Sequence, residues 1–84
     1  MWANEYGALK KQNRKRFDAL CLADRNTITV AMESIQNASW NLYEVERVRK
    51  DLIDMAEKAK EEGKTLAEAL GPDRRRVFDE MARE

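Results

Sequence analysis

Apolar residues near the amino end of the chain recur at steps of three and four, the spacing that places side chains on one face of an α-helix. The row consists of Trp2, Tyr6, Leu9, Asn13, Arg16/Phe17 and Leu20. It predicts a first helix over residues 2–22 with a heptad-like seam, and Asn13 is the polar residue in its middle. An Asn in such a seam fixes register or partner number at a cost in stability. The alternative is that the helix frays or tilts there and leaves Asn13 in water.

A second helix is predicted over residues 25–39, with Asp24 as its N-cap, because a carboxylate there accepts from free backbone N–H groups. Its apolar row is Ile28, Met32, Ile35, Ser39 and Leu42. The stretch "NTITV" is rich in β-branched residues and allows a short strand instead, although no partner strand is visible.

A third helix is predicted from residue 42 to Glu62. Asn41 and Glu44 have the spacing of a capping box, Trp40 and Val45 have that of a hydrophobic staple, and Gly63 fits the position after the last turn. The apolar row is Val45, Val48, Leu52, Met55 and Ala59. Because the apolar phase slips only once near Leu42, one unbroken helix over residues 25–62 is the alternative.

Thr65 and Glu68 form a second capping box, which opens a short helix that stops at Gly71. Pro72 suits the first turn of a last helix, whose apolar side would be Val77, Phe78 and Met81. The sequence therefore predicts one all-α domain over residues 1–84. We expect a compact bundle of about five helices: three longer ones, a very short fourth and a C-terminal fifth.

The third helix is densely charged, yet its charges fall off the apolar row. Many acidic and basic residues stand one turn apart, the arrangement of a solvated helix face: Glu46 with Lys50, Arg47 with Asp51, Lys50 with Asp54, Asp54 with Lys58, and Lys58 with Glu62. The chain has no histidine, which removes di-iron Glu-x-x-His sites, Ser-His-Asp and Cys-His nucleophile systems and the zinc-peptidase motif. We expect no catalytic residue, no metal site, no cofactor and no enzymatic activity.

So short a chain buries only about 60% of its unfolded surface, and its apolar rows exceed what one core can cover. Residues 1–23 hold five basic and two acidic residues, net +3, and residues 24–63 hold six and nine, net −3. These segments can attract each other within one chain or between two. The sequence predicts self-association, as a homodimer, or binding of a protein partner. The expected interface residues are Trp2, Tyr6, Leu9, Asn13, Trp40 and Tyr43.

Nucleic acid is the alternative partner. The basic cluster Lys10, Lys11, Arg14, Lys15 and Arg16 has no interleaved aromatic residue for base stacking. The segment "TLAEALGPDRRRV" is similar to a helix-turn-helix, with Arg74, Arg75 and Arg76 where base contacts are made. Pro72 and Glu80 depart from that pattern. The alternatives are a small DNA-binding or transcription-accessory protein that uses segment 65–82, and a helical cap that closes the bundle.

Cys21 is the only cysteine, so the chain forms no internal disulfide. A single thiol and the absence of a signal sequence suggest the reducing cytoplasm. No apolar run approaches the length of a membrane span. Cys21 lies between Leu20 and Leu22 and is expected to be half-buried and structural.

The blocks "LADRNTITVAMESIQ", "VRKDLIDMAEKAKEEGK" and "LGPDRRRVFDEM" resemble a small bacterial family of helical proteins, a domain of unknown function often described as a DNA-binding ferritin-like protein. The resemblance covers roughly residues 20–82 and is best at Asp51 to Ala56 and at Gly71, Asp73, Phe78, Asp79 and Glu80. It implies a helical fold. The family has no established activity, so it transfers no catalytic residue. This chain lacks the Gly-rich connection that often follows Trp40 in the family, and Asp79 replaces a frequent Cys.

Overall fold

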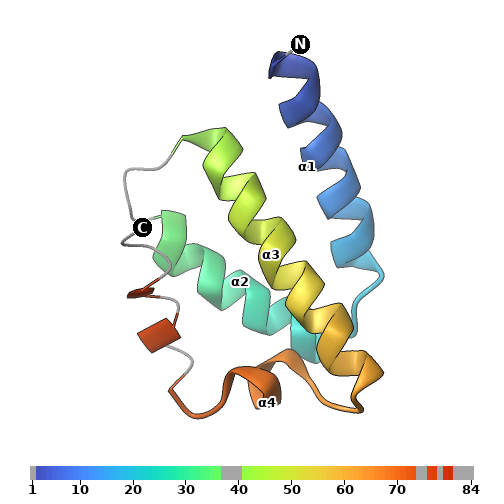
Figure 1. Cartoon of the computed structure of the whole chain (residues 1–84), viewed down its shortest axis with the longest axis vertical. Helices are drawn as coiled ribbons and strands as arrows, with labels where there is room; N and C mark the ends of the chain where they lie inside the picture. The colour runs from blue at the N-terminus through green and yellow to red at the C-terminus, as the bar shows by residue number, and fades with distance from the viewer. Residues whose placement is uncertain (1, 37–40, 74–75, 78, 81–84) are drawn as a thin grey trace.

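The computed structural model describes residues 2–36, 41–73, 76–77 and 79–80, which fold as four α-helices and contain no strand (Figure 1). The helices are α1 (Trp2–Asp18), α2 (Leu22–Gln36), α3 (Leu42–Glu61) and α4 (Leu66–Leu70). The all-helical prediction is confirmed at this level. The "NTITV" stretch lies inside α2 and is helical, because its Ile28 belongs to a regular row of buried residues.

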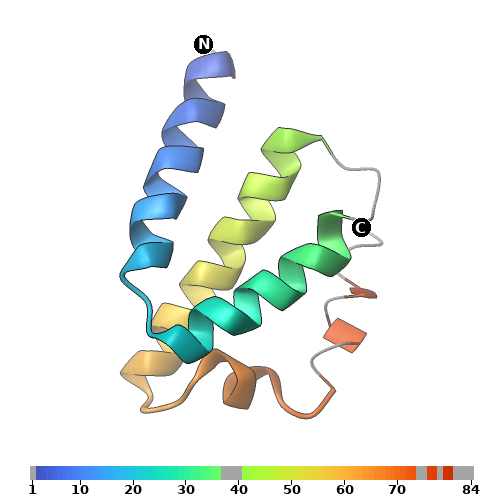
Figure 2. The ribbon, with the colours of Figure 1, turned by 180° about the vertical axis from the view of Figure 1, so that it is seen from behind.

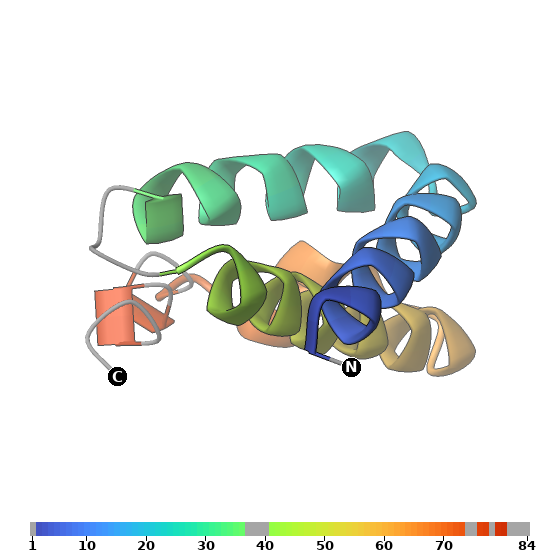
Figure 3. The ribbon, with the colours of Figure 1, turned by 90° about the horizontal axis from the view of Figure 1, so that it is seen from above.

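The central helix of the bundle is α3, which packs against α1, α2 and α4. Figures 1 and 2 show that α1 and α3 run in the same direction. α2, which lies between them in the sequence, carries the chain back toward the end where α3 begins. α2 and α3 lie side by side and run in opposite directions in the view from above (Figure 3). The short α4 contacts both α2 and α3 and closes the end of the bundle where α2 begins and α3 ends. α1 hardly touches α2.

The buried core lies mainly between α2, α3 and α4. Its members are Leu20, Ile28, Ala31, Met32, Ile35, Val45, Val48, Leu52, Ile53, Ala56 and Leu66, with Phe17, Met55 and Leu70 packed against them. Two of these residues, Phe17 and Leu20, come from α1 and the turn after it. α1 is therefore joined to the core only at its carboxyl end.

The first two helix boundaries differ from the sequence-based expectation. α1 ends at Asp18 instead of residue 22, because the chain turns to bury Leu20 at 8% exposure. α2 begins at Leu22, and the N–H of Arg25 donates to the carbonyl of Cys21 at 3.0 Å, so Cys21 takes the place of the cap residue. Asp24 thus lies inside α2, and the expectation that it caps this helix is wrong.

The boundaries of α3 agree with the sequence. Asn41 is extended, with φ −78° and ψ 165°, and its Oδ1 accepts from the N–H of Glu44 at 2.8 Å. An unbroken helix over residues 25–62 is therefore wrong, because Asn41 leaves the helical conformation. The expected staple partner Trp40 lies outside the described residues. At the other end Gly63 has φ 73°, and the N–H of Lys64 donates to the carbonyl of Ala59 at 2.8 Å, which forms a Schellman cap.

The capping box of α4 is confirmed. The N–H of Thr65 donates to Glu68 Oε1 at 3.0 Å, and the N–H of Glu68 donates to Thr65 Oγ1 at 3.2 Å. The expected fifth helix is not established, since Arg74, Arg75, Phe78 and residues 81–84 lie outside the described part of the chain. The residues described there, 76–77 and 79–80, are in helical conformation, and the N–H groups of Arg76 and Val77 donate to the carbonyl of Asp73 at 2.9 and 3.2 Å.

Candidate functional site

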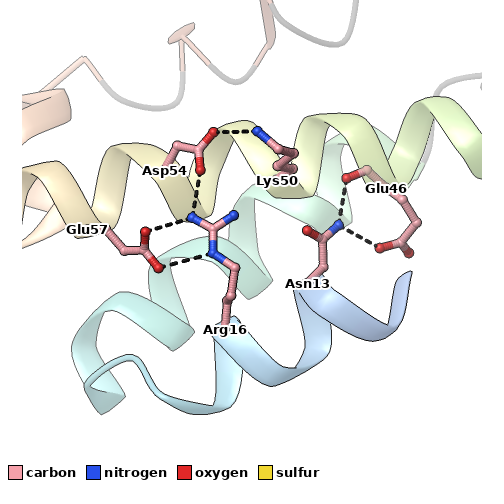
Figure 4. Close-up of polar contacts among 6 residues, drawn as sticks. All are labelled: Asn13, Arg16, Glu46, Lys50, Asp54 and Glu57. Carbon is pink, nitrogen blue, oxygen red and sulfur yellow. Dashed lines mark hydrogen bonds and ion pairs between the residues drawn. The ribbon is translucent and has the colours of Figure 1, made fainter. Parts of the chain in front are cut away.

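Asn13 joins α1 to α3 through a buried hydrogen-bonded contact. Its side chain is 1% exposed, and Nδ2 donates to the backbone carbonyl of Glu46 at 2.8 Å and to Glu46 Oε1 at 3.1 Å (Figure 4). The reverse amide orientation would place an oxygen against two acceptors, so the contacts fix the orientation. Asn13 is therefore buried against α3, and the expectation that it lies in water is wrong. Its expected place at an interface with a partner stays a prediction.

Arg16 forms the second contact, one turn further along α1. Its Nε and Nη2 donate to the two carboxylate oxygens of Glu57 at 3.2 and 2.6 Å, and Nη2 also donates to Asp54 Oδ1 at 2.6 Å. Lys50 pairs with the other oxygen of Asp54 at 3.0 Å. This fork-to-fork geometry is the strongest form of an ion pair between Arg and a carboxylate. We refer to Asn13 and Arg16, together with Glu46, Asp54 and Glu57, as the polar latch.

The charges of the latch are stabilised in their ionised forms. Burial raises the pKa of Asp54, but the hydrogen bonds from Arg16 and Lys50 outweigh burial and hold that pKa below its ordinary value. The hydrogen bonds from Arg16 to Glu57 and Asp54 raise the pKa of the Arg16 guanidinium. Groups held in their charged forms are suited to holding two helices together and unsuited to exchanging protons near neutral pH.

The expectation of a purely solvated carboxylate face on α3 is corrected. Of the residue pairs expected one turn apart, Lys50 with Asp54 is formed. Glu46 is 6% exposed and lies against Arg49 at 3.3 Å, while Asp54 and Glu57 bind Arg16. The partners on α1 are 33–41 residues away in sequence, which local spacing cannot reveal. No group of three or more metal-ligating side chains occurs among the described residues.

A surface groove lies beside the latch, between α1 and α3, with a volume of about 290 Å³. It is lined by Lys10, Arg14, Phe17, Asp18, Glu46 and Arg49. Two of the expected nucleic-acid residues, Lys10 and Arg14, therefore stand at this groove, and Lys10 also lies 5.9 Å from the ring centre of Tyr6. Lys11 and Lys15 are exposed elsewhere on α1. The groove mixes three basic with two acidic residues, so it is not a strongly basic channel.

The other expected interface residues are distributed differently. Tyr6, Leu9 and Tyr43 are half-buried, whereas the side chain of Trp2 and the whole of Trp40 lie outside what the structure describes. None of residues 5–12 belongs to the buried core. The N-terminal end of α1 extends past the beginning of α3 (Figures 1 and 2).

The helix-turn-helix-like segment is described only in part. Leu66 is fully buried, so α4 closes the core. Arg76 is exposed and lies 3.5 Å from Glu80, and Arg74 and Arg75 are outside the described residues. Cys21 is exposed, which corrects the expectation of a half-buried thiol.

No family model, curated protein or solved structure matches this chain. The resemblance to the ferritin-like family of unknown function therefore stays a prediction. Among the described helices, none is long and apolar enough to cross a membrane.

Proposed function

We propose that this chain is a non-enzymatic helical protein that works through self-association, as a homodimer, with α1 as the interacting element. The observation that carries this function is the position of residues 5–12. They form part of a helix that projects beyond the bundle, and none of their side chains enters the core. An isolated helix of this length is marginal in water. A partner that covers the Tyr6 and Leu9 side would stabilise it.

Two further features support a second copy as that partner. Tyr6 and Leu9 lie on the same side of α1 and are already half-buried, so covering them costs little polar desolvation. The net charges of +3 on residues 1–23 and −3 on residues 24–63 favour contact between the amino-terminal helix of one copy and the middle segment of another. The absence of histidine from the sequence underlies the non-enzymatic assignment.

The test is the mass of the protein in solution by light scattering at micromolar concentration. We expect the mass of a dimer for wild type and a shift toward monomer for Leu9→Ser. Lys11→Ser is the matched control, because Lys11 is exposed on a different side of α1, and it should remain dimeric. Circular dichroism confirms that both variants stay helical. A wild-type monomer whose mass does not change with concentration contradicts this function.

DNA binding is the second candidate function. The observation that favours it is the set of exposed basic residues on α1, namely Lys10, Lys11, Arg14 and Lys15. Four basic side chains can neutralise a few phosphate groups, and the affinity for DNA would then fall as salt is added.

A further inference from the structure

The turn between α1 and α2 contains no residue type that would prevent this segment from being helical. Residues 19–21 are Ala19, Leu20 and Cys21, without Gly or Pro, and none of them has a positive φ. The N–H groups of Ala19 and Leu20 donate to carbonyls three residues back, at 3.2 and 3.0 Å, as in a tightened helix end. The local sequence is therefore compatible with a continuous helix over residues 2–36.

The contacts of α1 allow it to be exchanged between copies. α1 packs on α3 and hardly touches α2, its neighbour in sequence. Its attachment consists of the polar latch and of the side chains Phe17 and Leu20. The latch and the Phe17 contact can form equally well with the α3 of a second molecule, since nothing in them requires that the two helices belong to one chain.

We infer that the dimer is formed by exchange of α1: the turn at residues 19–21 straightens, and the α1 of each copy docks through Asn13 and Arg16 on the α3 of the other. This arrangement presupposes the self-association proposed above and names the contacts through which the two copies are joined. Each α1 keeps the same place on an α3, so any cover of Tyr6 and Leu9 is an additional contact between the copies. Exchange of an identical element is a low-cost route to a dimer, because it reuses contacts that the single chain already makes.

Charge reversal on the two sides of the latch tests the exchange directly. Arg16→Glu places a carboxylate against Asp54 and Glu57, and the double variant Asp54→Lys with Glu57→Lys places two ammonium groups against Arg16. Each variant alone has a repulsive latch. In an exchanged heterodimer both latches are complementary. The α1 that carries Glu at position 16 meets the α3 that carries Lys at positions 54 and 57, and the unaltered α1 meets the unaltered α3.

The two variants are unfolded together in urea, refolded and measured by native mass spectrometry and thermal melting. We expect the heterodimer to exceed the share given by random mixing, and the melting temperature of the mixture to rise above that of either variant. A heterodimer at or below the random share, with no rise in melting temperature, overturns the exchange. If the heterodimer is not enriched but wild type is dimeric in the same experiment, the exchange is wrong and the self-association is retained. If wild type is a monomer, both ideas fail.

A variant of the turn provides an independent test that leaves the latch intact. Leu22 is the first residue of α2 and is 64% exposed. Proline is well suited to this position, where the missing N–H removes no helical hydrogen bond, but it breaks a helix that continues through it. Leu22→Pro should therefore fold as a closed monomer, while Leu22→Ala should dimerise as wild type does. A Leu22→Pro variant that dimerises with wild-type affinity overturns the exchange.

Discussion

The carboxylate of Asp24 accepts a hydrogen bond from the backbone N–H of Leu66 at 2.8 Å, so a residue in the first turn of α2 caps α4. Asp24 is 3% exposed and Leu66 is fully buried. A helix of five residues has little stability of its own. The side chain of Thr65 satisfies a second N–H at the same helix end. The two caps, one local and one from α2, hold α4 over the end of the core.

Replacing Asp24 should therefore loosen the closed end of the bundle. We expect Asp24→Ala to lower the free energy of unfolding by about 1–2 kcal/mol, the usual cost of a lost cap or a buried unsatisfied N–H. Asp24→Asn retains an acceptor oxygen and should lose less. Urea denaturation followed by circular dichroism gives the values. Glu33→Ala, an exposed position on the same helix, is the control, and an equal loss in both Ala variants would contradict the capping role of Asp24.

Asp24 also shows which contacts can be predicted from the sequence and which cannot. A carboxylate near a helix start was correctly interpreted as a cap, but it was assigned to the wrong helix. The caps at Asn41 and Thr65 were predicted correctly, because each bonds to a residue three positions away. The same holds for Gly63, whose role depends on the last turn of α3 alone.

The latch was missed for the opposite reason. Asn13 and Arg16 appeared in the apolar row of the first helix, Asp54 appeared as a surface charge, and Glu57 was not singled out. Their pairing depends on α1 and α3 lying side by side in the same direction. The only local clue was that Asn13 and Arg16 interrupt an apolar row at one-turn spacing, which shows that this face meets polar groups without showing which ones.

Asn13 gives the second prediction. Asn13→Leu removes the two hydrogen bonds that α1 donates to the buried carbonyl and carboxylate of Glu46 and leaves Arg49 as the partner of that carboxylate. We therefore expect a loss of about 1–3 kcal/mol in the free energy of unfolding. Asn13→Asp should lose more, because it places a second carboxylate beside Glu46. Chemical denaturation is the measurement, with Gln12→Leu as the exposed control. If Asn13→Leu is more stable than wild type, the free-energy cost of burying the polar groups of Asn13 and Glu46 exceeds the stability that their hydrogen bonds contribute.

Acid should weaken the latch. The pKa of Asp54 in the folded chain lies below its ordinary value of 3.8. A carboxylate with a lowered pKa contributes stability that is complete above the unfolded pKa and is lost as the pH falls through the folded pKa. The side chain of Asp54 is 44% exposed, so solvent screening limits its share to less than about 1 kcal/mol.

The pH dependence is measured as the midpoint of urea unfolding between neutral and acid pH. Asp54→Asn should flatten the acid side of this curve, whereas Asp51→Asn, an exposed position on α3, should leave it nearly unchanged. Some acid sensitivity should persist in Asp54→Asn, because hydrogen bonds from the N–H and hydroxyl of Thr65 also lower the pKa of Glu68. Identical curves for Asp54→Asn and wild type would mean that the latch adds nothing to stability.

Two glycines should respond in opposite directions to the same substitution. Gly63 has φ 73°, a conformation that strains any side chain, so Gly63→Ala should lower the free energy of unfolding by about 1 kcal/mol. Gly7 lies inside α1, and an added Cβ there meets no atom within 4 Å. Gly7→Ala should raise helical stability by up to about 1 kcal/mol. Thermal melting of the two variants beside wild type tests both signs together.

Duplex DNA should bind weakly or not at all. Residues 64–84 hold five basic and five acidic residues, net 0, and Arg76 already lies near Glu80. On α1, Lys10 and Arg14 share a groove with Asp18 and Glu46. A protein without a concentrated basic surface releases few counterions and gains little affinity for phosphates.

The measurement is a titration of labelled mixed-sequence duplex at low salt, followed by fluorescence anisotropy. Wild type is compared with a variant in which Arg74, Arg75 and Arg76 are Ala, and with Lys11→Gln combined with Lys15→Gln on α1. We expect all three proteins to bind no better than a neutral protein does. Tight binding by wild type that weakens steeply with added salt, and that the triple-Ala variant loses while remaining folded, would replace self-association with DNA recognition by segment 65–82. Loss only in the Lys11 and Lys15 variant would instead place the DNA contacts on α1.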